Sequence, residues 1–389
     1  MSWTTMQFEE LYAEPSRNGV YKSKEFQGTG IPIVKMNEIF ENWRIHAGDF
    51  ELDRFQLSSN EQQRFHLEID DLIFARTSVV PDGVGKCSLI CTIESDLAFE
   101  SNLIRVRLDK IKVNPVYIFY FFQSPVGRGR VLAISNGVSV RTIRGSDLKG
   151  IKVDLPERKT QELIVSILST YDDLIENNRR RIELLEKAAR LLYKEWFVQL
   201  HFPGHEHVKI VGGVPEGWGK KLLGEVVDIK KGKNITKEIA IEGDVPVVAG
   251  GLTPAYFHNT ANTIGPVITV SASGANAGYV NLYYEDIWAS DCSYISRTST
   301  EFIFYYYLVL ISNQKEIFGF QKGAAQPHVY PKDLMRLTLL VPTQAIIRMF
   351  EQTISKNFLL IDVLRKQNKL LVKARDLLLP KLMNGEVVV

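Results

Sequence analysis

The longest regular alternation of apolar and polar residues in this chain runs from Thr160 to Trp196. The stretch contains neither proline nor glycine, and its apolar residues recur at alternating steps of four and three. Such spacing is typical of a coiled-coil seam, with Glu, Lys and Arg on the opposite face. At ~1.5 Å per residue, a helix of this length would extend roughly 50 Å. The predicted seam positions are Ile164, Leu168, Tyr171, Ile175, Asn178, Ile182, Leu185 and Leu192.

A second long helix is predicted from about Thr343 to Met383, and it ends before Asn384-Gly385. A single helix cannot bury an apolar stripe alone, so the economical arrangement pairs the two helices antiparallel. Asn178 and Asn368 both fall on the seam, where a buried polar residue can fix the register at some cost in stability. The seam positions predicted for the second helix are Ile361, Leu364, Asn368, Leu371 and Leu378.

The chain is a unit of about 190 residues written twice, which is the signature of an internal repeat. Pro156 and Pro342 lie 186 positions apart (342 − 156), and Asp147-Leu148 matches Asp333-Leu334 at the same offset. Each copy is expected to be a globular half followed by a long helix, with the halves at opposite ends of the helix pair and related by a pseudo-twofold axis. The predicted boundaries are 1–155 for the first globular domain, 156–200 for the central helix, 201–217 for a linker, 218–342 for the second globular domain and 343–385 for the distal helix.

Both globular halves alternate short runs rich in Ile and Val with Gly, Pro and Asp, a pattern typical of strands and turns. Residues 116–132 instead predict a helix, and the glycine-rich stretch that begins at Ser271 predicts a turn between two strands. The predicted fold class is α+β, with two similar mixed α/β domains separated by two long antiparallel helices that form a coiled coil. Periodicity does not predict the strand order.

Composition is ordinary for a soluble globular protein, with 45% hydrophobic and 24% charged residues in 389. The three cysteines, Cys87, Cys91 and Cys292, form no C-x-x-C pair, so reduced thiols in a cytoplasmic protein are expected. The N-terminal stretch has no apolar signal core, and the longest apolar run, 302–311, is too short to cross a membrane. We therefore expect no membrane association.

Catalytic motifs are absent from the sequence. It has no phosphate-binding loop, no dinucleotide fingerprint, no base-methylation motif and no G-x-S-x-G. His201, His205 and His207 lie close together in the linker, but neither Cys nor a run of carboxylates accompanies them. The sequence therefore predicts no catalytic residue and no metal site in this chain.

Positive charge is concentrated locally although the formal net charge is only +2. Residues 126–144 hold four arginines and no acid, and residues 220–237 hold six lysines against two acids; both stretches are predicted to be loops. Either stretch could be a solvated surface loop. Two similar basic segments at the ends of a rigid spacer, however, suit a duplex DNA site with two halves. The predicted helix length places these half-sites about one to one and a half turns apart, at ~34 Å per turn. The candidate DNA-binding residues are Arg76, Arg128, Arg130, Arg141 and Arg144 in the first half and Lys231, Lys233, Asn234, Lys237, Gln326 and His328 in the second.

The order and doubling of several short motifs resemble the specificity subunit of type I restriction–modification systems over essentially the whole chain. The motifs are the two D-L-x(7)-P boundaries at 147–156 and 333–342, the two Thr-Gln pairs, and the two L-L-x-K-A-x-x-L-L helices. The stretch Gln326–Tyr330 also resembles the segment that ends a target-recognition domain in that family. The first half departs from the family at this point, with the sequence Val140-Arg141-Thr142-Ile143.

This resemblance implies a non-catalytic subunit with two target-recognition domains, each reading half of a bipartite asymmetric DNA site, and a helix pair that sets the unread spacer. It also implies partners: two modification subunits that carry S-adenosylmethionine, docked on the exposed helix faces and adjoining domain surfaces, and restriction subunits that use ATP and Mg. No cofactor is expected on this chain itself. The half-sites should differ, because Arg76-Thr77-Ser78 in the first half stands against Ser271-Ala272-Ser273 in the second.

Two other functions remain open from the residues alone. A chain with two globular heads on a coiled coil could be a scaffold that binds only proteins. It could also be an orphan DNA methyltransferase whose motifs are not recognisable.

Overall fold

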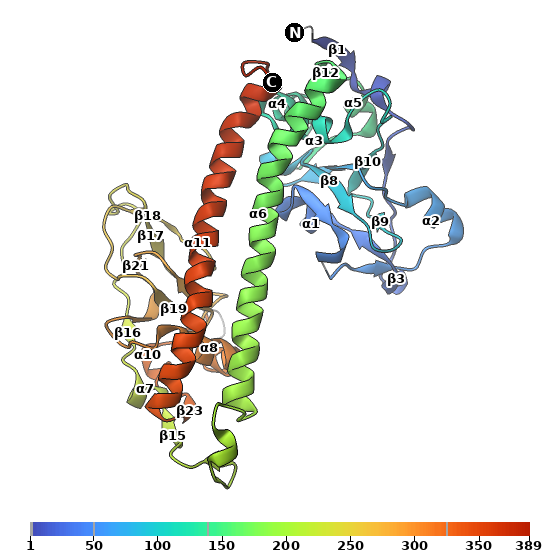
Figure 1. Ribbon diagram of the computed structural model, residues 1–389. Coiled ribbons are helices and arrows are strands. Elements are labelled where there is room, and N and C mark those ends of the chain that lie inside the picture. The colour runs from blue at the N-terminus through green and yellow to red at the C-terminus, as the bar shows by residue number, and fades with distance from the viewer. Residues whose placement is uncertain (1–2, 50, 138–139, 324–325) are drawn as a thin grey trace. The chain divides into compact units, whose positions relative to one another are not determined.

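The structure is a computed structural model that describes residues 3–49, 51–137, 140–323 and 326–389 (Figure 1). Its contacts divide the chain into two compact units, Met1–Ile175 with Lys369–Val389 (unit 1) and Glu176–Asn368 (unit 2). Both long helices, α6 (Arg158–Tyr193) and α11 (Gln344–Met383), contribute a segment to each unit. The sequential domain boundaries remain a prediction, since this division cuts across both helices.

Unit 1 is built on a five-stranded sheet of order β2-β10-β6-β8-β4, in which only β4 runs parallel to its neighbour. A second sheet has the order β5-β3-β9, and β1 pairs with β12. The elements are β1 (Thr4–Gln7), β2 (Arg17–Asn18), β3 (Gln27–Val34), α1 (Met36–Glu41), β4 (Arg44–His46), β5 (Arg54–Phe55), α2 (Ser59–Phe65), β6 (Leu72–Ala75), β7 (Thr77–Ser78), β8 (Cys87–Thr92), β9 (Ala98–Phe99), β10 (Leu103–Val106), α3 (Pro115–Gln123), α4 (Pro125–Ala133), β11 (Arg141–Thr142), α5 (Gly145–Lys149) and β12 (Lys152–Leu155), with short 3₁₀ turns at Phe8–Leu11, Lys24–Phe26, Ala47–Asp49 and Pro81–Gly83.

Unit 2 contains a four-stranded sheet of order β16-β22-β19-β20, a second sheet of order β18-β17-β21 and the pair β15-β23. The predicted turn after Ser271 joins β19 to β20, as expected. The elements are β13 (Ile210–Val211), β14 (Val214–Pro215), β15 (Gly219–Leu222), α7 (Leu223–Val226), β16 (Lys230–Lys231), β17 (Val245–Val248), β18 (Tyr256–His258), β19 (Val267–Ser271), β20 (Val280–Tyr283), β21 (Trp288–Ala289), β22 (Cys292–Ser296), α8 (Ile303–Ser312), α9 (Gln314–Gly319), α10 (Pro331–Leu334) and β23 (Thr338–Val341), with a π-helical turn at Lys194–Val198 and a 3₁₀ turn at His205–His207.

The predicted internal repeat is confirmed by the strand order, which is the same in both units. The four strands β2-β10-β6-β8 correspond to β16-β22-β19-β20, and β5-β3-β9 corresponds to β18-β17-β21. The parallel pair in the second sheet recurs as well, as β3 with β9 and as β17 with β21. Unit 1 differs by one added strand, β4, at the edge of its main sheet.

The predicted antiparallel helix pair is present in each unit. In unit 1, Ile164 and Leu168 of α6 are buried in the same apolar cluster as Leu379 and Leu382 of α11. In unit 2, Asn178 donates from Nδ2 to Oδ1 of Asn368 over 2.9 Å, and farther along α6 Glu186 pairs with Arg365. Each predicted seam position is buried or half-buried.

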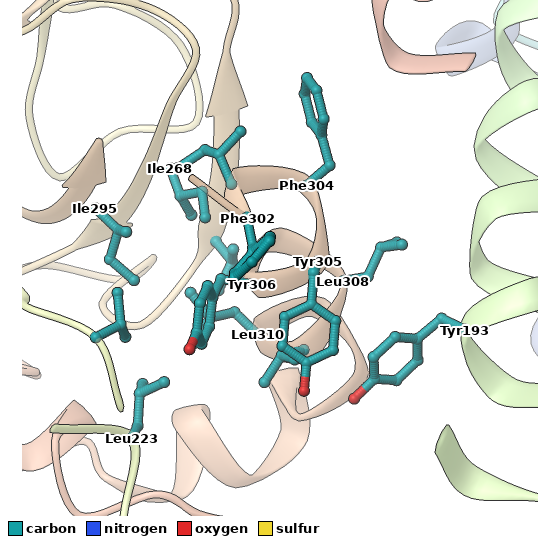
Figure 2. Close-up of a cluster of buried hydrophobic side chains, with 14 of the residues drawn as sticks. Tyr193, Leu223, Ile268, Ile295, Phe302, Phe304, Tyr305, Tyr306, Leu308 and Leu310 are labelled. Carbon is teal, nitrogen blue, oxygen red and sulfur yellow. The ribbon is translucent and has the colours of Figure 1, made fainter. Parts of the chain in front are cut away.

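An aromatic cluster joins α6 to the sheet domain of unit 2. Tyr193 near the end of α6 lies towards Tyr305 of α8, and their ring centroids are 6.4 Å apart (Figure 2). The apolar run 302–311 lies mostly in α8, which is almost entirely buried. Burial on all sides explains why this run is apolar without being a membrane span.

The linker is more ordered than predicted. It contains a 3₁₀ turn and the hairpin β13–β14, which reverses at Gly212 and Gly213, both with positive φ. Nδ1 of His201 lies 2.7 Å from Oε1 of Glu195, where a protonated ring nitrogen donates to the carboxylate. Within the described residues, no group of three or more His, Cys, Asp or Glu side chains could hold a metal ion.

Candidate nucleic-acid interface

Each unit folds the same small backbone ladder beside the end of its central strand. In unit 1, the N–H of Ile143 donates to the carbonyl of Arg76 over 2.9 Å, and Asn136 and Thr142 exchange backbone hydrogen bonds of 2.9 and 2.8 Å. The chain reverses between them through Gly137, whose φ of 108° is in the left-handed region that favours glycine. We call residues 76–78 with 141–144 the unit 1 paired loop.

The unit 2 paired loop, residues 272–274 with 326–329, has the same connections. Val329 donates to the carbonyl of Ala272 over 3.0 Å, and Lys322 and His328 exchange backbone hydrogen bonds of 3.0 and 2.9 Å. Gly323 has a φ of 97°, and it lies 186 residues after Gly137 (323 − 137). The repeat therefore extends to individual backbone hydrogen bonds at the candidate site.

The ladder corrects the predicted correspondence between the two halves. Arg76 and Ala272 occupy equivalent places, so Arg76-Thr77-Ser78 stands against Ala272-Ser273-Gly274 and not against the triplet that begins at Ser271. Ser271 is the last residue of β19, where it pairs with Cys292 and is buried. The prediction was one residue early because the end of β19 is set by pairing with β22, which sequence does not show.

Three of the predicted arginines of the first half gather at the unit 1 paired loop. Arg141 is half-exposed and its backbone pairs with Ser78, while Arg144 is exposed at the start of α5. Arg76 is half-buried, and its Nη1 lies 3.5 Å from the carbonyl oxygen of Ser101. Within the described residues these three guanidinium groups form no ion pair, so their positive charge is uncompensated.

Residues 125–133 are the helix α4, so the helix predicted over 116–132 is confirmed as α3 and α4, and the loop predicted for the overlapping basic stretch 126–144 is wrong there. Ser124 caps the helix, with its Oγ accepting from the N–H of Gly127 over 3.2 Å, and Pro125 occupies the first turn. Both are standard helix-start signals, which the density of arginine and glycine obscured.

Arg128 and Arg130 lie on α4 and are engaged within unit 1. Arg128 donates from Nη2 to the carbonyl of Asp82 over 2.6 Å, and burial lowers the pKa of its guanidinium. Arg130 pairs with Asp154 at 2.6 Å and lies over the ring of Phe121, 5.5 Å from its centroid. These two side chains therefore hold α4 against the domain.

The predicted lysines of the second half follow strand β16. Lys231, Lys233, Asn234 and Lys237 are all exposed, and within the described residues the three lysines form no ion pair. The backbone of this segment is fixed even so, since the carbonyl of Lys233 accepts from Nε1 of Trp288 over 2.7 Å. An anchored backbone thus presents exposed cationic side chains to solvent, an arrangement that suits contacts with phosphate groups.

Two sets of predicted residues that lie far apart in sequence meet in unit 2. The N–H of Gly232 donates to the carbonyl of Cys292 over 2.8 Å, while Ser273 Oγ donates to the carboxylate of Asp291. The lysine segment and the unit 2 paired loop therefore lie at the same end of the sheet, next to the start of β22. In that loop Gln326 is exposed, and the ring of His328 stacks on that of Tyr330 at 5.6 Å with an interplanar angle of 4°.

A family model for the type I restriction modification DNA specificity domain matches residues 2–187 and 215–367. The chain belongs to this family. Members are specificity subunits of type I restriction–modification systems, which recognise DNA sequence, contain no catalytic centre of their own and work with methyltransferase and restriction subunits. The two matches fall on the two copies of the repeat, and neither the scaffold nor the orphan methyltransferase is favoured.

Similar specificity subunits come from distant organisms. The MjaIX specificity subunit of Methanocaldococcus jannaschii is 27% identical over 394 residues, covering 94% of this chain and 89% of that subunit. The EcoKI specificity subunit of Escherichia coli is 31% identical over 176 residues, 44% of this chain. The crystal structure of a type I S subunit from Mycoplasma genitalium has the same fold, with a TM-score of 0.63, 19% identity and coverage of 98% of this chain and 96% of that one.

Among the described residues, no helix is both long enough and apolar enough to cross a membrane. Sequence reasoning also missed two exposed side chains at the candidate interface, Val79 and Val80. The available signal was a pair of β-branched residues inside a polar turn.

Proposed function

We propose that this specificity subunit recognises a bipartite asymmetric DNA site, with each paired loop reading one half. The observation that carries the proposal is the repeated backbone ladder, which presents the same geometry but different side chains in the two units. Identical scaffolds suit the repeating backbone of duplex DNA, while different side chains suit two different base sequences. The residues proposed to face DNA are Arg76, Arg141 and Arg144 in unit 1 and Lys231, Lys233, Asn234, Lys237, Gln326 and His328 in unit 2.

The experiment is selection from a randomised duplex library by the complex of this chain with its modification subunits. The selected site should have two unlike halves separated by an unread spacer, and a palindromic site would contradict the proposal. Phosphate contacts should appear as salt dependence: Lys231→Gln with Lys233→Gln should reduce the slope of log K against log salt by about 2, close to 0.9 per lost contact. The matched control is Lys209→Gln with Lys315→Gln, two exposed lysines elsewhere in unit 2, which should leave the slope unchanged.

A second surface, on the helices, supports the proposed partners. Exposed apolar residues recur at the same four repeat positions in each unit. In unit 1 they are Leu163, Leu174, Leu370 and Leu377; in unit 2 they are Met349, Leu360, Leu184 and Leu191. Every pair differs by 186, for example 349 − 163 and 370 − 184. Large apolar side chains exposed in a repeated stripe mark a protein-interaction surface.

We infer that this helix stripe docks two modification subunits, one on each unit. Those subunits would supply S-adenosylmethionine, and restriction subunits would supply ATP- and Mg-dependent translocation and cleavage, all in the cytoplasm. The helix pair would set the spacer between the half-sites, since both helices pass through both units.

Native mass spectrometry of the assembled complex tests the stoichiometry. Leu370→Glu with Leu377→Glu should reduce the number of bound modification subunits from two to one, and Leu184→Glu with Leu191→Glu should do the same on the other unit. Combining all four substitutions should abolish binding, because a charge in an apolar interface is strongly unfavourable. Two bound subunits in the fourfold variant would contradict this assignment. Glu substitutions at the exposed Lys187 and Lys373, on the same helices, are the matched control.

A further inference from the structure

The hairpin that leads into the unit 1 paired loop is three residues longer than its counterpart in unit 2. Gly85 donates to the carbonyl of Ala75 over 2.7 Å and closes a turn of nine intervening residues (85 − 75 − 1). Gly278 donates to the carbonyl of Ser271 over 2.8 Å and closes a turn of six (278 − 271 − 1). The added length in unit 1 includes Val79 and Val80.

These valines are held out in solvent. The exposed fraction is 76% for Val79 and 58% for Val80, and that of Val140 in the facing segment is 47%. All three line a pocket of about 470 Å³, which Met36 and Phe40 also line. Single exposed apolar residues need no explanation, but a contiguous apolar patch beside a hollow marks a binding surface. The shorter hairpin of unit 2 has Gly274-Ala275-Asn276 at its tip, so the fold itself does not require the valines.

The charge around the patch indicates what covers it. Arg141 follows Val140 directly, its backbone pairs with Ser78, and within the described residues it forms no ion pair. An apolar surface bordered by a free cation matches the major groove of DNA, where thymine C5-methyl groups lie close to phosphates. The carboxylate of Asp82, which also lines the pocket, suits the amino groups of cytosine or adenine, which are the donors in that groove.

A protein partner is a poorer occupant of this patch. The helix stripe that we assign to the modification subunits is the same in both units, whereas among the residues that the structure describes the valine patch occurs in unit 1 alone. A feature confined to one unit can distinguish the two halves of the DNA site. If a protein partner bound this patch, a second copy of that partner would find no equivalent surface on unit 2.

We propose that unit 1 reads thymine through methyl contacts made by Val79, Val80 and Val140. Unit 2 reads its half-site through hydrogen-bonding groups instead, supplied by Ser273, Gln326 and His328. This inference rests on the proposed function, and it states how the two half-sites differ: the half read by unit 1 contains thymine whose methyl group is part of the signal.

Replacing thymine by deoxyuridine tests the proposal, because the exchange removes the methyl group and leaves the base-pairing edge intact. Each thymine of the selected duplex is replaced in turn, and Kd is measured with the complex of this chain and its modification subunits. At least one replacement should weaken binding about fivefold to 30-fold, the range expected for the loss of a good apolar base contact. In the variant Val79→Ala with Val80→Ala, that same replacement should have less than a twofold effect.

The control variant is Val211→Ala in the linker hairpin, where the side chain is 75% exposed; it should keep the full sensitivity to deoxyuridine. Since Val79 and Val80 are also exposed, their double variant should unfold at the same temperature as the parent. If binding is sequence-selective but no deoxyuridine matters, or if the double variant keeps the sensitivity, the thymine reading is overturned and the proposed function stands. If the complex shows no sequence selectivity at all, the proposed function fails and this inference fails with it.

Discussion

A buried ion pair in unit 1 occupies positions that are apolar in unit 2. Nη1 of Arg375 in α11 lies 2.5 Å from Oδ1 of Asp172 in α6, and the guanidinium stacks on Trp43 at 4.0 Å. The hydroxyl of Tyr120 donates to the other carboxylate oxygen over 2.6 Å. The equivalent positions in unit 2, 186 residues away in each direction, hold Phe358 and Ala189, which are both buried. Equivalent buried positions of the repeat are thus filled by an ion pair in unit 1 and by apolar side chains in unit 2.

Removing one member of this pair should be far more harmful than removing both. Arg375→Ala leaves the carboxylate of Asp172 buried without its cation and should lower the free energy of unfolding by about 3–5 kcal/mol. Asp172→Phe with Arg375→Ala copies the apolar arrangement of unit 2 and should recover most of that loss. Urea unfolding followed by circular dichroism measures both. The surface pair of Arg44 with Asp173, 64% exposed at the carboxylate, supplies the control: Asp173→Ala should cost below about 1 kcal/mol. Equal losses for Arg375→Ala and Asp173→Ala would contradict the prediction.

Glu351 should make the stability of unit 2 depend on pH. Its carboxylate accepts the N–H groups of Phe304 and Tyr305 over 3.2 and 2.8 Å at the start of α8, and burial raises its pKa from the usual 4.5 to about 7. The folded chain therefore holds this proton more tightly than the unfolded chain. The resulting stabilisation is complete below about pH 4.5 and is lost as the pH rises through 7.

Glu351→Gln should remove this dependence, because a glutamine amide does not ionise, while its single oxygen can still accept one of the two backbone N–H groups. The difference between the two pKa values sets an upper limit on the order of 3 kcal/mol for the change in unfolding free energy. Urea midpoints at pH 5 and pH 8 should therefore converge in the variant but differ in the parent. Glu316→Gln, an exposed residue on α9 of the same unit, should leave the parent's dependence intact. A parent with identical midpoints at both values of pH would refute the assignment.

At the scale of elements, the sequence predicts helices from the periodicity of their apolar residues, but it does not predict which strands pair with one another. The seam of α6 and α11 followed from apolar spacing alone, because a helix face is defined within one segment. The same counting missed Asp172 as a buried seam-side residue, since its burial depends on a partner about 200 residues away (375 − 172). Strand order, the added edge strand β4 and the length of the β6–β8 hairpin depend on hydrogen bonds between distant segments, which no local pattern contains.

The prediction from composition was partly wrong for the two segments rich in arginine or lysine. Arginine and glycine between 126 and 144 suggested a loop, but Ser124-Pro125 starts a helix and turns Arg128 and Arg130 towards acceptors in their own domain. The predicted lysines at and after the end of β16 do lie exposed, and within the described residues they form no ion pair. The sequence therefore shows where the cationic residues are, but it does not show which of them bind acceptors within their own domain.

At the scale of the whole molecule, the candidate site depends on bringing together segments that sequence keeps apart. Arg76 and Arg141 come together because β7 pairs with β11. The lysine segment and the unit 2 paired loop come to the same end of the sheet because β16 and β19 both pair with β22. The internal repeat is visible in the sequence at a constant offset, so the presence of two DNA-recognition sites could be predicted. The residues that form each site could not. What links two readers into one function is the pair of helices that both units share.

Lengthening that helix pair should lengthen the spacer of the DNA site. Inserting three heptads into α6 after Ile175 and three into α11 after Asn368 keeps the apolar seam in phase. At ~1.5 Å per residue the 21 added residues contribute ~31 Å, or about nine base pairs at ~3.4 Å each. This is close to one turn of B-DNA, so both half-sites stay on nearly the same face. Selection on duplexes with graded spacers should recover the same half-sites with about nine more base pairs between them.

Inserting 21 Gly and Ser residues at the Gly212–Gly213 turn should leave the spacer length unchanged, since that hairpin lies outside both helices. An unchanged spacer in the lengthened helix variant would show that the helices do not set the distance.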